Sequence, residues 1–484
     1  MKKILSLTLV ILMVLSLSAC APGEKGTKLD PNNPVSITVW HYYNGAVMNA
    51  FDDLVKDFNE TAGREQGIIV QGASISNVND LQTAVLASAR KEVGSAEMPN
   101  IFASYADTAY AVQQMDVLVD LGKYFNEKEL SEYIPAYIEE GRIGSNNELM
   151  IFPIAKSTEI FMINTTDWTP FASESGHTYD DLATPEGIAT VAKAYYEWTD
   201  AKTPDVPNDG RAFFGRDAVA NMFVIGAKQL GAEILKVDKG VATLTVDKDA
   251  MRRIFDTYYL PYVSGYFLSA GRYRSDDTKV GEIISYVGST SSAMYFPQEV
   301  TFDGETYPVE PAIFPAPVFE GAINVVVQQG AGMVVAKATP EKELASAIFL
   351  KWFTGTDVNS KFSALSGYMP VKTEANDYDK FMEILAANNI TQDEVSKETL
   401  KVAFDMIKTH ELYTSKAFEN GLQVRDILTS YLQNKADTDR AAVVEALTAG
   451  ATLEEAIAPY AADGNFESWY AGFSDTILKL APTK

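Results

Sequence analysis

Val35-Ser-Ile-Thr-Val-Trp-His-Tyr-Tyr-Asn-Gly-Ala-Val-Met-Asn-Ala-Phe-Asp-Asp-Leu-Val-Lys-Asp-Phe58 is the stretch that decides the fold of this 484-residue chain. Apolar and polar residues alternate over 35–40, which predicts a strand. From Val47 to Phe58 apolar residues recur at helical spacing, which predicts a helix. Further strands are expected at 68–70 and 101–103, each followed by a helix. Strand and helix alternating at intervals of about 30 residues are typical of a parallel sheet.

Three turns follow the predicted strands, at residues 42–45, 74–76 and 105–107. In an open α/β sheet, ligands bind beyond the carboxyl ends of the strands, where loops and helix starts converge. These turns are therefore the first place to expect a binding site. The second helix should begin after Asn77, a residue type that caps helices.

Two further caps are expected later in the chain. Thr452, with Glu455 three positions later, fits the capping box of a helix. The Gly-Ser-Thr-Ser-Ser run at 288–292 is expected to cap the segment that leads to Met294 and Tyr295.

The N-terminus has the pattern of an export signal. Lys2 and Lys3 precede an apolar run at 4–17, which is shorter than the roughly 20 apolar residues that span a bilayer. The run closes with Leu17-Ser-Ala-Cys20, which resembles the bacterial lipobox. We predict a signal peptide at 1–19, lipidation of Cys20 and a tethering linker at 20–34. The alternative is a plain secretion signal with an incidental cysteine.

Composition excludes several classes of function. Cys20 is the only cysteine, so the mature chain has no thiol left for a disulfide, a zinc–cysteine site or a nucleophile. The formal net charge is −25, which repels nucleic acid and anionic lipid, since both are bound by Lys and Arg. We expect no nucleic-acid partner, and contact with the membrane through the lipid anchor only.

Five sequence pieces in a fixed order carry a resemblance. The chain resembles the extracellular solute-binding proteins of ABC importers, in the sugar-binding family that includes maltose- and glycerol-3-phosphate-binding proteins. The pieces are Ile37-Thr-Val-Trp-His41, Met98-Pro-Asn-Ile-Phe102, Phe152-Pro-Ile-Ala-Lys-Ser-Thr-Glu159, Gln329-Gly-Ala-Gly332, and Phe349-Leu-Lys-Trp-Phe-Thr354 continuing to Gly367-Tyr-Met-Pro-Val371.

The resemblance implies an α/β, periplasmic-binding-protein-like fold of two discontinuous lobes, with a ligand cleft between them and a helical C-terminal region. We place the N-lobe at 35–156 plus 308–372 and the C-lobe at 157–307 plus 373–484. The chain would cross near 152–159 and return near 307–317. The implied partners are a small solute and ABC permease subunits. We expect a lipid-anchored monomer on the extracytoplasmic face of the cell membrane, without metal or cofactor.

The predicted cleft carries a mixture of side chains suited to a sugar. Sugars present flat apolar faces and a rim of hydroxyls, which aromatic rings, amides and carboxylates recognise. Gly330 and Gly332 could let the backbone approach a ligand, and Arg425 matches an arginine of the family's framework. Each position has an alternative role in packing. The candidates are Tyr42, Tyr43, Asn44, Tyr105, Asp107, Ser157, Thr158, Glu159, Tyr295, Gly330, Gly332, Tyr368 and Arg425.

The ligand could be neutral or could carry a phosphate. In glycerol-3-phosphate-binding relatives an arginine grips the phosphate, and this position falls near Ala417 in the present chain. A buried phosphate without a cationic partner is costly. We therefore favour a neutral oligosaccharide, and a phosphodiester held by Lys416 is the alternative.

Two other classes of function are an enzyme and a surface adhesin. His41, His177 and His410 lie far apart without metal-ligand spacing, and no Gly-x-Ser-x-Gly motif is present. We expect no enzyme, although acidic pairs of a glycoside hydrolase are not visible in a sequence. A surface adhesin that keeps this fold is the remaining alternative.

Overall fold

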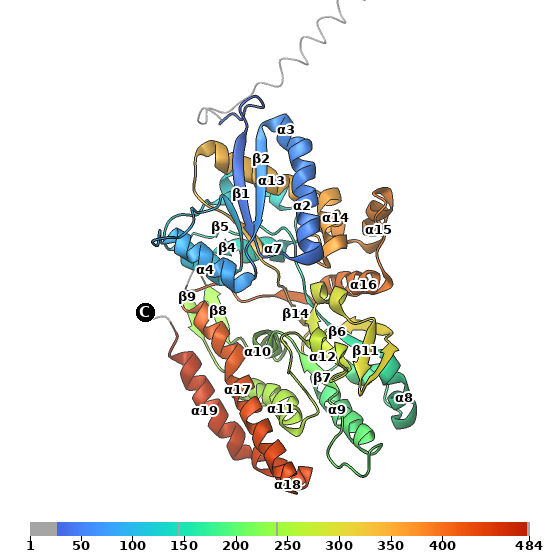
Figure 1. Cartoon of the computed structure of the whole chain (residues 1–484). Coiled ribbons are helices and arrows are strands. Elements are labelled where there is room, and N and C mark those ends of the chain that lie inside the picture. The colour runs from blue at the N-terminus through green and yellow to red at the C-terminus, as the bar shows by residue number, and fades with distance from the viewer. Residues whose placement is uncertain (1–26, 144–145, 239–240, 482–484) are drawn as a thin grey trace, which may run out of the picture.

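The computed structural model describes residues 27–143, 146–238 and 241–481. Two four-stranded sheets organise these residues, one in each half of the molecule (Figure 1). Helices pack on both sheets, and each half has a large apolar core of its own. The molecule is thus built from two α/β units.

The first sheet, in the upper half of Figure 1, forms around the predicted strand at 35–40. Its central strand β1 runs parallel to both neighbours, whereas the edge strand β15 is antiparallel to β3. Ile37 and Val39 alternate into the core and are fully buried, as the sequence pattern predicts. The strand order is β15-β3-β1-β2, with β1 (Val35–His41), β2 (Ile68–Ser74), β3 (Ile101–Ser104) and β15 (Gly332–Val335).

The helices of the first half follow the predicted periodicity. The apolar face of α2 is buried from Val47 to Phe58, and the side chain of Asn77 accepts two backbone N–H groups at the start of α4. Both predictions are confirmed. The elements of this half are α2 (Gly45–Glu60), α3 (Ala62–Gln66), α4 (Val78–Ala89), α5 (Ala106–Gln113), α6 (Glu127–Leu130), α7 (Pro135–Gly141), α13 (Pro340–Phe353), α14 (Thr356–Ser366) and the hairpin β4 (Arg142–Ile143) with β5 (Glu148–Leu149).

The second sheet has the order β13-β6-β10-β7 and mixed polarity. Its strands are β6 (Glu159–Asn164), β7 (Phe214–Arg216), β10 (Ser285–Ser289) and β13 (Pro311–Pro315). The long helix α17 packs against α10 and α11. The helices are α8 (Thr165–Ser175), α9 (Pro185–Asp200), α10 (Val219–Gln229), α11 (Lys248–Ser264), α12 (Arg274–Lys279), α17 (Gly421–Thr448), α18 (Leu453–Ala461) and α19 (Asp463–Leu478), with hairpins β8 (Leu235–Asp238)–β9 (Val241–Leu244) and β11 (Glu299–Phe302)–β12 (Glu305–Pro308).

Two helices bridge the halves on one side of the molecule (Figure 1). α15 (Tyr378–Ala387) packs on α14 of the first half, whereas α16 (Glu394–Thr409) packs on β13 and β6 of the second. The chain also passes between the halves at 154–159 and at 328–331, where Ser157 and Gln329 pair backbone to backbone. β14 (Val325–Val327) and β16 (Glu411–Tyr413) run in parallel beside this point.

Some sequence-based boundaries differ from the structure. Residues 311–315 are extended, as expected, but they pair with β6 in the second sheet, although the sequence analysis placed them in the N-lobe. The region from 373 onward is not wholly helical, because β16 interrupts it, and α15 packs on the first half. The capping box predicted for Thr452 and Glu455 is present at the start of α18.

The predicted signal peptide and Cys20 lie outside the described residues. Within residues 27–143, 146–238 and 241–481, no helix is long and apolar enough to cross a membrane.

Candidate ligand site between the two sheets

Three tyrosines of the first half meet where its strands end and its loops begin. Tyr42 follows β1, Tyr105 precedes α5, and Tyr368 follows α14; we call these three the tyrosine cluster. Burial raises the pKa of Tyr42, and the neighbouring Tyr105 and Tyr368 raise it further, so the three side chains lie close together. All three are predicted site residues, and the fold brings them together.

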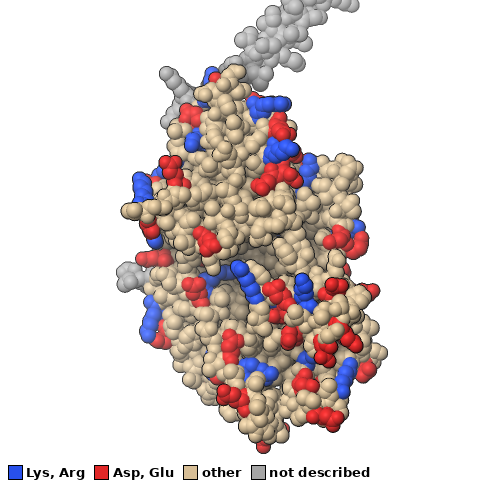
Figure 2. Space-filling view, in the orientation of Figure 1, with Lys and Arg blue, Asp and Glu red and all other residues tan. Residues whose placement is uncertain are grey.

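The tyrosine cluster lies in a recess. The Tyr105 side chain is 37% exposed, yet the surrounding protein raises its pKa, mainly by burial. Burial also raises the pKa of Tyr42 and of Tyr368. Tyr42 and Tyr105 also line a small pocket of the first half, together with Gln82 and Thr108. Figure 2 shows a hollow across the middle of the molecule, with blue cationic side chains in it.

The second half supplies the facing side of the site. The 3-10 turn Thr290–Tyr295 follows β10, and its Ser291 is a neighbour of the Tyr368 hydroxyl. A Cβ on Gly367 would stand 3.0 Å from the Cα of Ser291, so the two halves touch here. Tyr295 is 54% exposed at the edge of the same contact. Its ring is therefore available to a ligand from the second half.

Asp107 and Arg425 face each other across the halves. Asp107 is in the first turn of α5, and its Oδ1 lies 2.1 Å from where a Cβ on Gly421 would stand. Burial raises the pKa of Asp107 to about 6, although the positive charge of Arg425 opposes this shift. Arg425 Nη2 donates to Asn221 Oδ1 at 3.3 Å. A carboxyl and a guanidinium thus bracket one end of the tyrosine cluster.

The crossing segment 156–159 is buried and carries two ion pairs, one directed into each half. Lys156 Nζ bonds Glu140 Oε2 at 2.5 Å and the Gly330 carbonyl at 2.9 Å. Glu159 pairs with Arg216 and accepts from Asn221 Nδ2 at 2.8 Å. Asn221 Nδ2 also donates to Gln329 Oε1 at 3.0 Å. These bonds fix the segment that joins the halves.

Several predicted site residues occupy packing or backbone positions instead. The Tyr43 ring is 4% exposed and packs among His41, Phe51 and Phe362. Asn44 is exposed at the start of α2, and its side chain does not cap that helix with a hydrogen bond. The side chains of Ser157 and Thr158 are fully or nearly buried in the crossing segment.

The two glycines serve the fold. Gly330 has φ +98°, a conformation that side chains rarely adopt, and its carbonyl accepts Lys156. A Cβ on Gly332 would stand 2.4 Å from Ile151 Cγ2, so this position is needed for packing of β15. Neither glycine is seen to open backbone toward the tyrosine cluster.

The three histidines lie apart from one another, each with its own neighbours. His41 is 1% exposed, and burial lowers its pKa to about 4, so the ring is neutral at physiological pH. His177 lies beside Asp181 and His410 beside Thr409, both at the surface. Across the described ranges, no group of three His, Cys, Asp or Glu side chains is placed to hold a metal ion.

Three polar residues outside the predicted set contact predicted site residues: Arg216 and Asn221 bind Glu159, and Ser291 lies beside Tyr368. Arg216 ends a strand of the second sheet, so a correct strand assignment would have drawn attention to it. Ser291 belongs to the run 288–292, which was correctly predicted to cap the segment that follows it. Asn221 lies inside α10, where nothing in the local sequence distinguishes it from a surface amide.

Comparison with known proteins identifies similar folds over nearly the whole chain. The family described as bacterial extracellular solute-binding protein matches residues 53–391. The cyclic alpha-maltosyl-1,6-maltose binding protein of Arthrobacter globiformis is 15% identical with a TM-score of 0.64, covering 92% of this chain and 100% of that one. No curated protein sequence matches the chain.

Two further solved structures show the range of similar proteins. UgpB from Mycobacterium tuberculosis, in complex with glycerophosphocholine, is 18% identical with a TM-score of 0.61, covering 92% of this chain and 99% of that one. The maltotriose-bound maltotriose binding protein of Thermus thermophilus is 16% identical with a TM-score of 0.56 at the same coverage. At these identities the likeness shows the fold alone, and these neighbours are binding proteins.

Proposed function

The chain belongs to the bacterial extracellular solute-binding proteins, and from this membership we propose that it captures a neutral sugar or short oligosaccharide and delivers it to the permease of an ABC importer. The two α/β halves act as lobes that close on the ligand by hinge motion at 154–159 and 328–331. A ligand that contacts both halves favours the closed arrangement.

The observation that carries the proposal is the tyrosine cluster facing Tyr295 across the halves. Aromatic rings that are exposed within a recess offer flat apolar surfaces to sugar rings, and their hydroxyls offer hydrogen bonds. Asp107, Asn221 and Gln329 add acceptors and donors at the edge of the same site. This combination matches the alternating apolar faces and hydroxyl rims of a saccharide.

The electrostatics favour a neutral ligand. Three cations near the crossing already have carboxylate partners: Lys156 with Glu140, Arg216 with Glu159, and Lys416 with Glu139. A phosphate that bound one of these cations would displace its carboxylate partner. That carboxylate would then be left without a counter-charge, which is costly. The position near Ala417 is apolar and 4% exposed. Arg425 faces Asp107 and has no ion pair within 4 Å among the residues that the structure describes, and this guanidinium favours an anionic ligand such as a phosphodiester.

A thermal-shift screen tests the proposed ligand class. The protein is heated with maltotriose, larger cyclic and linear oligosaccharides, glycerophosphocholine and glycerol 3-phosphate. A ligand at 100 times its dissociation constant stabilises the fold by about 2.7 kcal/mol, which is visible as a raised Tm. A shift with neutral saccharides alone supports the proposal. A shift with the phosphate compounds alone overturns the neutral class and leaves the family intact.

A matched pair of tyrosine variants tests whether the hollow is the site. Tyr295→Ala removes a ring that is 54% exposed at the contact between the halves. Tyr273→Ala removes a ring that is 52% exposed at the start of α12, elsewhere on the second half. If stacking occurs at the hollow, only Tyr295→Ala weakens sugar binding, by about 1 kcal/mol. Equal affinities for both variants would place the ligand elsewhere.

Attachment to the cell is part of the same proposal. Cys20 is the proposed site of lipidation, with residues 20–34 as the tether, and the protein acts as a monomer that the permease reads in its closed form. The description of the family as extracellular supports an extracytoplasmic location.

A further inference from the structure

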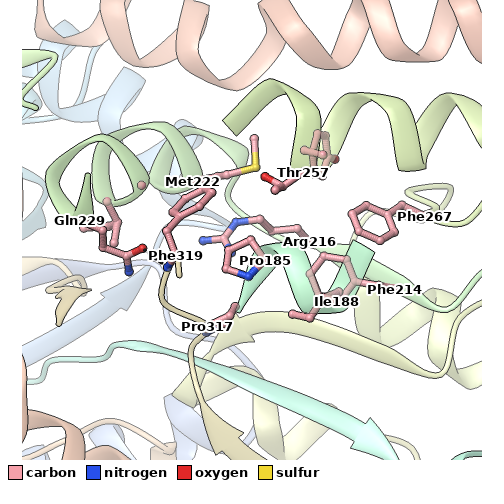
Figure 3. Close-up of a pocket in the computed structure, with 13 residues that line it drawn as sticks. Pro185, Ile188, Phe214, Arg216, Met222, Gln229, Thr257, Phe267, Pro317 and Phe319 are labelled. Atoms are coloured by element: carbon pink, nitrogen blue, oxygen red, sulfur yellow. Dashed lines mark hydrogen bonds between the residues drawn. The ribbon is translucent and has the colours of Figure 1, made fainter. Parts of the chain in front are cut away.

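A small pocket lies inside the second half, apart from the tyrosine cluster. It is bounded by α9, α10, α11 and the edge strand β7 and has a volume of about 50 Å³ (Figure 3). Its wall is mainly apolar, and Figure 3 shows Met222, Phe319 and Pro185 around the end of Arg216. Ile188, Phe214 and Phe267 complete the apolar wall.

The neutral polar groups of the wall are already used. Gln229 donates to the Val325 carbonyl at 2.9 Å and accepts from the Phe319 amide at 3.2 Å. The Thr257 hydroxyl donates to the Arg253 carbonyl, and the Tyr258 hydroxyl donates to Gln433. None of these three side chains needs a ligand to complete its hydrogen bonding.

Arg216 is different. Its side chain is 11% exposed, and one terminal nitrogen, Nη2, pairs with Glu159. Its Nε–H is buried and meets no acceptor among the described residues. A buried donor without an acceptor is costly, so the pocket has one strong hydrogen-bonding demand within an apolar wall.

The charges around Arg216 restrict what can meet this demand. Glu159 neutralises the guanidinium of Arg216. A second carboxyl, that of Asp217, lies near enough for the positive charge of Arg216 to oppose the rise in its pKa that burial causes. An anionic ligand would therefore be repelled by the acids that already balance the charge of Arg216. A cationic ligand would be repelled by Arg216 itself. A neutral acceptor avoids both costs.

We propose that this pocket binds a compact neutral molecule with an apolar body and a single hydrogen-bond acceptor, which takes the Nε–H of Arg216. A water molecule needs about 10–15 Å³ of such space, so the pocket holds a molecule of roughly the bulk of four waters. A branched alcohol of five non-hydrogen atoms fits this description. The pocket lies apart from the tyrosine cluster, and it is connected to the crossing segment by the ion pair of Arg216 with Glu159.

NMR of methionine methyl groups tests the inference on the full chain. Met222 lines the pocket, whereas Met251 is buried on α11 and is not among its lining residues, so the second methyl is an internal control. Three probes share one apolar body: tert-butanol, pivalate and tert-butylammonium. We expect tert-butanol to shift the Met222 signal saturably, and pivalate and tert-butylammonium to leave it unchanged.

Two variants complete the experiment. Arg216→Lys keeps a positive charge for Glu159 but removes the Nε–H donor, and Ile225→Phe adds bulk to the wall. Each should reduce tert-butanol binding at least tenfold while the Met251 signal keeps its folded position. Binding of pivalate in place of tert-butanol, equal binding of all three probes, no saturable shift, or unchanged binding by both folded variants would each overturn the inference.

Discussion

At the scale of single residues, the carboxyl of Asp107 shows how the contact between the halves changes acid chemistry. Burial raises its pKa to about 6, whereas an unfolded aspartate ionises near 4. Between these values the folded chain holds a proton that the unfolded chain has lost. The free energy of unfolding therefore falls as the pH rises from about 4 to 6.

Asp107→Asn removes this titration, because an amide is neutral at every pH. We expect the variant to be more stable than the parent by about 1 to 2 kcal/mol at pH 7.5 and by less at pH 5.0. Urea unfolding at the two pH values measures the difference. An equal gain at both would mean that the amide acts through packing and that the proton on Asp107 is irrelevant.

Arg425 distinguishes the two ligand classes. If the ligand is a neutral sugar, Arg425→Met loses at most a hydrogen bond, about 1 kcal/mol of binding free energy. If it is a phosphodiester, the variant loses a charge-assisted contact worth about 2 kcal/mol or more. Isothermal titration with whichever compound raises the Tm decides this, with Arg272→Met, on the loop that precedes α12, as a control.

At the scale of elements, the edge strand β15 depends on close packing. A Cβ on Gly332 would stand 2.4 Å from Ile151 Cγ2 and 2.8 Å from the Phe152 carbonyl. Gly332→Ala should therefore lower the free energy of unfolding by about 1 to 3 kcal/mol. Gly464→Ala in α19 meets nothing within 4 Å and should be neutral or stabilising. Similar urea midpoints for both variants would refute the packing argument.

The elements also show how far the sequence predicts the molecule. Local signals found β1, α2, the cap at Asn77 and the capping box at Thr452, because each depends on neighbouring residues. Pairing between distant segments has no such signal. The sequence therefore missed that residues 311–315 join β6, and that β16 pairs with β14.

The candidate site divides in the same way. Tyr42, Tyr105 and Tyr368 follow or precede predicted elements, so their positions could be anticipated. The ion pair of Arg216 with Glu159 could not, because it joins residues of two strands that are not adjacent in the second sheet. The burial of Tyr43 could not be anticipated, because alternation along a strand end does not say which ring turns into the core.

At the scale of the whole molecule, the proposed closure has a direct measure. Small-angle scattering should give a smaller radius of gyration with saturating sugar than without it, since a ligand bound to both halves favours their approach. Gly421→Val places bulk against Asp107 of the other half and should weaken binding and oppose the change. Identical scattering profiles at demonstrated saturation would indicate that the halves do not move.

The proposed anchor is tested separately from the ligand site. Cys20→Ser should move the protein from the membrane fraction to the soluble fraction without changing its Tm, since the proposed role of Cys20 is lipid attachment alone. One acyl chain holds a protein only weakly, so stable retention of the parent implies at least two. Continued retention of the variant would contradict lipidation at this cysteine.

The pairing of β3 with β15 has a consequence for how the cell makes this protein. Ile101 emerges from the ribosome long before its partner Val335, so the early chain carries a strand with an unfilled edge. Such edges recruit other chains and promote aggregation. The nascent polypeptide should therefore need a holding chaperone until its distant C-terminal third arrives, and late completion of the sheet would keep the chain unfolded while it is being exported.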